Sequence, residues 1–131
     1  RFWFSVYSPH RSRWTSYSRE EKAELLADHC GAMFEDWVRS CFPGAKRYWE
    51  SQAELDMVRQ ERLPAKGRAA EPTLVVTEIK WRKVSSAEGR SLAADLEARF
   101  RRTALAKQGR AVRFEVIDSS FLGKHEPAAD R

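Results

Sequence analysis

The sequence predicts an α/β domain whose four-stranded mixed sheet is flanked by two helices, in the order helix, three strands, helix, strand. Two observations predict the helices: residues 18–41 and 86–108 both repeat apolar side chains every three or four positions. A third predicts the sheet, because residues 73–81 (TLVVTEIKW) form the most β-prone segment, with apolar residues on both alternating faces.

The composition is that of one globular domain. The chain has 131 residues, 42% of them hydrophobic and 33% charged, with neither a long apolar run nor a signal peptide. A net charge of +5 makes a polyanion a reasonable partner, whereas nothing points to a membrane. Because the first residue is Arg1 and not Met, we expect the chain to be cut from a longer one.

The two cysteines indicate a reduced, cytoplasmic location. Cys30 and Cys41 lie eleven residues apart in one predicted helix, which separates them by roughly 16 Å, too far for a disulfide. The three histidines do not fall at spacings that would complete a zinc site with them.

Residues 1–19 are expected to form an extended aromatic arm or linker that follows a missing upstream module. Its large side chains are Phe2, Trp3, Phe4, Tyr7, Trp14 and Tyr17. So much aromatic surface must dock on something, either this domain or a neighbour, or the stacked bases of a nucleic acid. Packing is the favoured interpretation, since most aromatic side chains are core material.

The first helix begins after Ser18, an N-cap followed by acidic residues in the first turn, and ends near Cys41 before Pro43-Gly44. Residues 45–50 and 53–59 are predicted as a hairpin around Ser51-Gln52. Residues 60–72 are charged and small and contain Pro and Gly, which is typical of a loop.

After the central strand, the second helix ends at Gly109 and residues 111–117 form the fourth strand. The domain therefore spans residues 20–118, and residues 119–131 are expected to form a loose C-terminal tail.

A group of charged residues carries the candidate chemistry. Glu78 and Lys80 project from the same face of the central strand, where a polar pair is costly unless it has a role. If the preceding strand is a neighbour, Asp56 converges with Glu78, and two carboxylates favour a bound cation. Mg²⁺ (or Mn²⁺) suits Asp56, Glu78 and the Ile79 carbonyl, and Glu35 on the first helix could add a third carboxylate.

Glu35, Asp56 and Glu78-Ile79-Lys80, in this order of elements, resemble the PD-(D/E)XK nuclease superfamily with its restriction-endonuclease-like core. More narrowly, FWFSVYSPHRS, GAMFEDWV, ELDMV and TEIKW are similar to the domain of unknown function at the C-terminus of archaeal and bacterial P-loop ATPases. The chain departs from the superfamily pattern in that Leu55, and not Pro, precedes Asp56.

The resemblance implies metal-dependent hydrolysis of DNA phosphodiesters, by a domain attached to an ATPase module. Asp56 and Glu78 would hold one or two divalent ions, Glu35 would complete the shell, and Lys80 would orient the attacking water or offset charge on the phosphate. Backbone phosphates would be held by the residues Arg82, Lys83, Arg99, Arg101 and Arg102.

Other interpretations stay open. The acids and Lys80 could form a structural salt-bridge cluster, and Glu35 could simply pair with Arg39 one helical turn on. The arginines of the second helix could be a solvated face. A catalytically inactive module with the same fold would bind DNA, dock a protein or form a homodimer through the aromatic arm.

Overall fold

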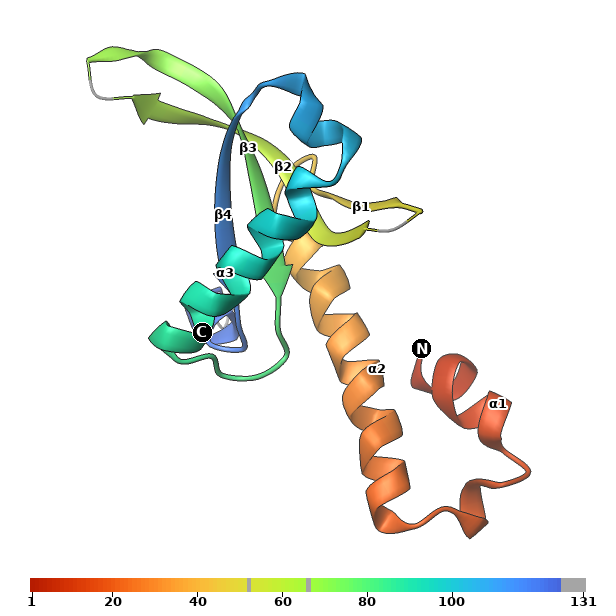
Figure 1. Ribbon diagram of the computed structural model, residues 1–131. Helices are drawn as coiled ribbons and strands as arrows, with labels where there is room; N and C mark the ends of the chain where they lie inside the picture. Colours follow the sequence, from red (N-terminus) through yellow and green to blue (C-terminus); the bar gives the residue numbers. More distant parts are fainter. Residues whose placement is uncertain (52, 66, 126–131) are drawn as a thin grey trace.

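The computed structural model describes residues 1–51, 53–65 and 67–125, and it confirms the α/β class with a four-stranded mixed sheet (Figure 1). The strands lie side by side in chain order, with β1–β2 and β2–β3 antiparallel and β3–β4 parallel. Their bounds are β1 Lys46–Glu50, β2 Ala53–Ala65, β3 Arg68–Ile79 and β4 Ala111–Ile117. The central position predicted for the 73–81 segment is therefore confirmed.

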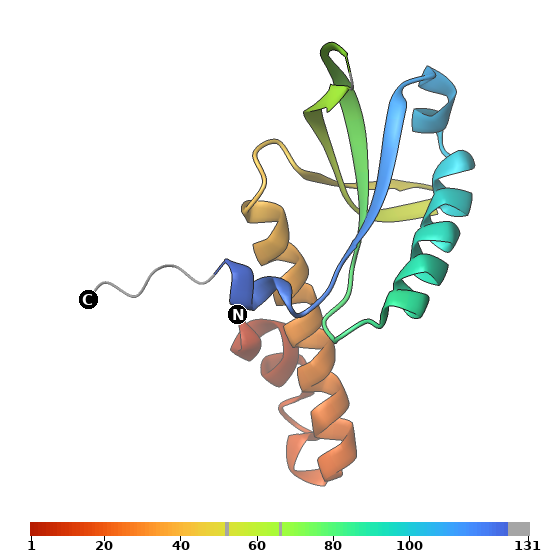
Figure 2. The same cartoon turned by 90° about the vertical axis from the view of Figure 1, so that its left-hand side faces the viewer.

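Two long helices cover opposite faces of the sheet (Figure 2). Helix α2 (Arg19–Ser40) begins at a capping box in which Ser18 and Glu21 bond each other's backbone amides. Helix α3 (Ser86–Arg101) begins at the Ser85 N-cap and supplies the crossover between the parallel strands β3 and β4.

Each helix closes its own apolar core. On the α2 side the buried residues are Phe34, Val38, Met57, Ile79 and Ile117. On the α3 side they are Leu55, Leu74, Val76, Leu96 and Phe100. Strand β3 contributes to both cores, as expected of a central strand that is apolar on both faces.

The structure corrects the prediction of a loop over residues 60–72. Strands β2 and β3 continue as an antiparallel ladder out to the pair Ala65 and Arg68, so most of this segment is a hairpin. Pro64 and Gly67 suggested a loop, but a ladder is held by backbone bonds and needs no apolar pattern where it is exposed. The second helix is also shorter than predicted: it ends at Arg101, and Ala104–Gln108 is a 3₁₀ helix.

The prediction of an extended N-terminal arm is wrong, because the arm folds into short helical turns beside α2 (Figure 1). The turns are a π-helical turn Trp3–Tyr7, helix α1 (Ser8–His10) and a 3₁₀ turn Trp14–Ser16. The ring of Phe2 contacts that of His29 on α2, with centroids 5.4 Å apart, and Val6 is buried. Packing against this domain is therefore confirmed for the arm.

The segment after β4 starts with a short helix, α4 (Phe121–Lys124), whose Phe121 ring packs edge-on against Trp37 of α2. The rest of the predicted tail, residues 126–131, lies outside the described residues. Cys30 and Cys41 are free thiols, as predicted. Among the described residues, no helix is both long and apolar enough to cross a membrane.

Candidate active site

An irregularity in β2 places Asp56. Tyr48 of β1 pairs with Leu55, but Lys46 pairs with Val58, so β2 holds one more residue than its partner over this stretch. This is a β-bulge, which redirects side chains and is frequent next to active sites. It explains how Leu55 and Met57, two apart on one strand, enter opposite cores.

Within the bulge, the Asp56 carboxylate reaches across to the neighbouring strand. Its Oδ2 accepts a hydrogen bond of 2.9 Å from the backbone N–H of Ile79. The side chain thus replaces a regular ladder partner at the end of β3, and it lies beside the backbone of Glu78 and Lys80.

Glu78 is 5% exposed, and two cations hold its carboxylate. Lys80 Nζ lies 2.8 Å from Oε1, and Arg99 Nη2 of α3 lies 2.5 Å from Oε2. Arg99 also donates to the Glu54 carbonyl oxygen at 3.1 Å, which anchors α3 to β2. The structure thus pairs Glu78 with Lys80, and it adds Arg99, a partner that the sequence did not predict.

The pKa values of Glu78 and Asp56 are shifted in opposite directions. Burial would raise the pKa of Glu78, but hydrogen bonds from Lys80 and Arg99 outweigh it and lower that pKa. Burial raises the pKa of Asp56; the Ile79 amide opposes this, and the negative charge of Glu78 adds to it. Asp56 thus bonds a backbone amide, whereas Glu78 is held by two cations.

Glu35 lies on α2 and pairs with Arg39 at 3.7 Å, the alternative that the sequence left open. Burial raises its pKa, and so does the charge of Asp56, while Arg39 opposes them. Arg39 also donates to Asp36 and to the Asp56 carbonyl oxygen. Glu35 therefore senses Asp56 but is held by its own helix.

A three-carboxylate metal site is not assembled in the part of the chain that the structure describes. There, no group of three or more His, Cys, Asp or Glu side chains is placed to hold a metal. Asp56 and Glu78, with the Ile79 carbonyl, remain the candidate ligands, which suits Mg²⁺ because it is usually bound through one or two carboxylates and keeps several waters.

The five predicted phosphate-binding residues do not form one patch. Arg99 lies in the site. Arg82 pairs with Glu88, and Lys83 is exposed next to it, before the start of α3. Arg101 pairs with Glu97, and Arg102 caps α3 at its other end, which is roughly 24 Å away at 1.5 Å per residue.

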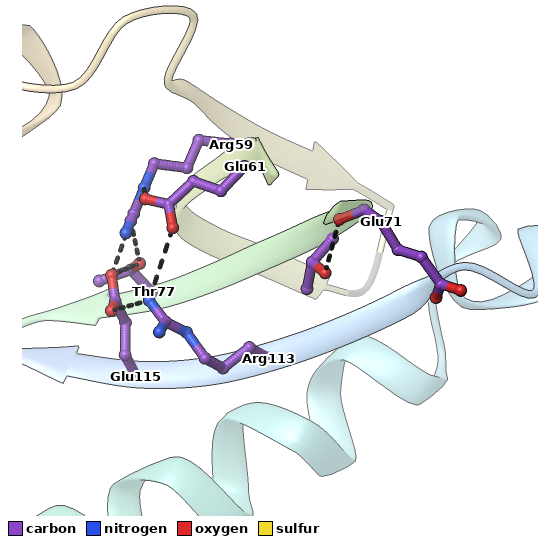
Figure 3. A network of polar contacts seen from close by, with 7 residues as sticks. Arg59, Glu61, Glu71, Thr77, Arg113 and Glu115 are labelled. Atoms are coloured by element: carbon purple, nitrogen blue, oxygen red, sulfur yellow. Dashed lines mark hydrogen bonds and ion pairs between the residues drawn. The ribbon is translucent and has the colours of Figure 1, made fainter. Parts of the chain in front are cut away.

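The sequence did not predict a second charged cluster, which lies on the α2 side of the sheet. It is a closed ring in which Arg59 and Arg113 each contact Glu61 and Glu115, at 2.6 to 3.7 Å (Figure 3). The buried hydroxyl of Thr77 donates to Glu115 at 2.8 Å. The sequence does contain a signal for this ring, since β2 and β4 each carry an Arg and a Glu two residues apart, on one face of the strand.

Comparison with family models, with curated proteins and with solved structures finds no match to the chain.

Proposed function

We propose that the chain is a metal-dependent nuclease domain of the PD-(D/E)XK type that hydrolyses DNA phosphodiesters. One observation supports it above the others: a bulge in β2 brings Asp56 onto the Ile79 amide, beside a buried Glu78 that Lys80 contacts. Asp56 thus bonds the residue between Glu78 and Lys80 and is close enough to both for their charges to act on it, although Asp56 and Glu78 are 22 residues apart in the chain.

The donor set fits a hard divalent cation. Asp56 and Glu78, with the Ile79 carbonyl, would hold Mg²⁺ or Mn²⁺ through oxygen atoms. When bound, such an ion polarises a phosphoryl oxygen and lowers the pKa of water. The raised pKa of Asp56 supports this assignment, because a carboxylate placed near another acid gains from a cation.

The chain's own residues have separate tasks in this proposal. Lys80, whose side chain is 32% exposed, is held by Glu78 and still reaches solvent, so its ammonium can stabilise negative charge on a phosphate. Arg99 holds the other oxygen of Glu78 and must give up part of that contact when a cation binds there. Glu35 would act on Asp56 through charge.

A second function is favoured by the same contacts. Because Lys80 and Arg99 already neutralise Glu78, the cluster could be a structural remnant in a module that only binds DNA or docks a protein. Placement of the domain at the C-terminus of a P-loop ATPase stays a prediction from sequence resemblance alone.

The test is divalent-ion binding and plasmid nicking for the parent, Asp56→Ala and Glu78→Ala. Glu24→Ala is the control, since Glu24 is an exposed acid in the N-terminal half of α2, outside the site. We expect Mn²⁺ affinity to fall at least tenfold and nicking to be lost in the two site variants only. Unchanged metal affinity in both site variants would contradict the proposed nuclease and favour the non-catalytic binding module.

A further inference from the structure

We propose that the outer part of the β2–β3 hairpin, described for residues 60–65 and 67–72, is a ribbon that binds in a groove of double-stranded DNA. Strand β1 pairs with β2 only as far as Val58, and β4 pairs with β3 only from Thr73 onward. Beyond these points the described hairpin is two strands wide and projects from the body of the molecule (Figures 1 and 2). The inference rests on the proposed function and names its substrate form, a duplex.

The ribbon does not serve the apolar core. Its described side chains include the exposed Gln60, Arg62 and Pro64 on β2 and the exposed Ala69 and Ala70 on β3. An isolated two-stranded hairpin is marginally stable in water, so this extension adds little to the stability of the fold. A role outside the fold accounts for its length.

The edges of the ribbon disfavour the addition of a strand from another protein. Pro64 and Pro72 lack the amide that a new strand would need, and the register shifts between Leu63 and Ala65. Proline, bulges and charge on an edge are the features that block strand addition. A partner that binds side chains and shape is therefore favoured over a partner strand.

The charge at this end of the molecule is complementary to DNA. By sequence, residues 60–72 contain three cations and two acids; Arg62 is exposed, and Glu61, one of the two acids, is held in the Arg59 and Arg113 ring. Arg110 is exposed and lies at the base of the ribbon, because β4 begins where the next residue, Ala111, pairs with Thr73.

The dimensions also fit. Two paired strands lie about 4.8 Å apart, and the major groove of B-DNA, about 12 Å wide, admits such a ribbon. Asp56 and Ala65 are nine residues apart on β2, or roughly 30 Å at about 3.3 Å per residue. That is close to the helical repeat of B-DNA, about 34 Å. The ribbon would therefore bind the duplex about one turn away from the phosphodiester that is cleaved at Asp56 and Glu78.

The experiment shortens the ribbon. Residues 62–72 are replaced by Asn-Gly, which turns the chain between Glu61 and Thr73, a pair that faces across the ladder. Binding to a labelled 25-base-pair duplex and to its single strand is measured by fluorescence anisotropy in EDTA, over a range of salt. Matched single variants, Arg62→Ala and Arg90→Ala, each remove one exposed arginine, on the ribbon and on α3 respectively.

We expect the shortened chain to bind the duplex at least tenfold more weakly, with a salt slope lower by about 2 because about two phosphate contacts are lost. Single-strand binding should change less than twofold, and Arg62→Ala should weaken duplex binding more than Arg90→Ala. Duplex binding equal to the parent's in both the shortened chain and Arg62→Ala, or no duplex binding by the parent, would overturn the inference.

The outcome separates this inference from the proposed function. Ribbon-dependent duplex binding without any nicking would support DNA binding by the ribbon and contradict the proposed nuclease activity. Nicking that survives in the shortened chain with unchanged duplex affinity would support the nuclease activity and contradict DNA binding by the ribbon. Thermal unfolding of the shortened chain reports whether its sheet is intact, and Arg62→Ala tests DNA binding by the ribbon without changing the backbone.

Discussion

The molecule holds two clusters built from the same kinds of side chain, the ring on the α2 side of the sheet and the candidate site at the β2 bulge. In the ring, Glu61 and Glu115 each contact both Arg59 and Arg113, so the cluster is closed and its formal charge cancels. At the bulge, Glu78 takes both Lys80 and Arg99, while Asp56 accepts a backbone N–H.

The difference is the reason for proposing a function at the bulge and a structural role for the ring. The ion pairs of the ring join β2 to β4, and both Arg59 and Glu115 bond Thr77 of β3, which lies between these strands. Uneven pairing leaves one carboxylate with a raised pKa beside one with a lowered pKa. Divergent titration of neighbouring acids is a feature of sites that bind cations or transfer protons.

The largest effect is expected at Lys80. Lys80→Met should reduce DNA cleavage by on the order of 10²–10³-fold, because a positioned charge on the phosphate is lost, while Mn²⁺ affinity should not fall, because Lys80 also occupies an oxygen of Glu78. Rates are measured by plasmid nicking at saturating Mn²⁺. Lys124→Met, which removes an exposed lysine of α4, is the control, and an equal loss in both variants would refute the role of Lys80.

The ring should respond in stability and not in activity. In Glu115→Gln, Arg59, whose side chain is 4% exposed, keeps only Glu61 as an anionic partner, so we expect a loss of about 2 kcal/mol in the free energy of unfolding. Urea denaturation measures it, with the exposed Glu71→Gln as control. Loss of metal binding in Glu115→Gln would blur the distinction between the clusters.

Arg99 offers a way to sharpen the comparison. Because its guanidinium occupies Glu78 Oε2, Arg99→Gln should free that oxygen and raise Mn²⁺ affinity by about tenfold, or about 1.4 kcal/mol. Isothermal titration measures the affinity, and Arg101→Gln, whose arginine pairs with Glu97 on the exposed surface, is the control. Weaker binding in Arg99→Gln would mean that Arg99 supports the ligand and does not compete for it.

Local signals explain what the sequence could predict. The start of α2 follows from Ser18 and Glu21, three residues apart, and β3 from a run of apolar residues. The exposed ribbon was mistaken for a loop because its ladder depends on backbone pairing and not on an apolar pattern.

The candidate site was predicted only in part, because local signals do not fix how a helix packs on the sheet. Asp56, Glu78 and Lys80 could be placed by strand order, which brings neighbouring strands together. The contact of Arg99 with Glu78 joins residues 21 apart on a helix and a strand. The angle at which α3 crosses the sheet decides it, and that angle depends on packing in the core around Leu96 and Phe100.

The smallest effect concerns the stability cost of the raised pKa at Asp56. Because the folded state holds the proton of Asp56 more tightly than the unfolded chain, whose ordinary value is 3.8, deprotonation destabilises the fold as pH rises through the folded pKa. Asp56→Asn keeps an oxygen for the Ile79 amide and removes the charge. We therefore expect a higher Tm for Asp56→Asn than for the parent at pH 7.

That gain should shrink as the pH falls through the folded pKa toward 3.8 and below, where the parent also carries a neutral Asp56. Thermal unfolding of both proteins at pH 7 and pH 3.5 tests it, with the exposed Asp28→Asn of α2 as control. Glu35 also has a raised pKa, but it is present in both proteins, so most of its contribution cancels in the difference. A gain independent of pH would place the effect of Asp56→Asn in packing, and the charge at the bulge would then carry no cost for a cation to relieve.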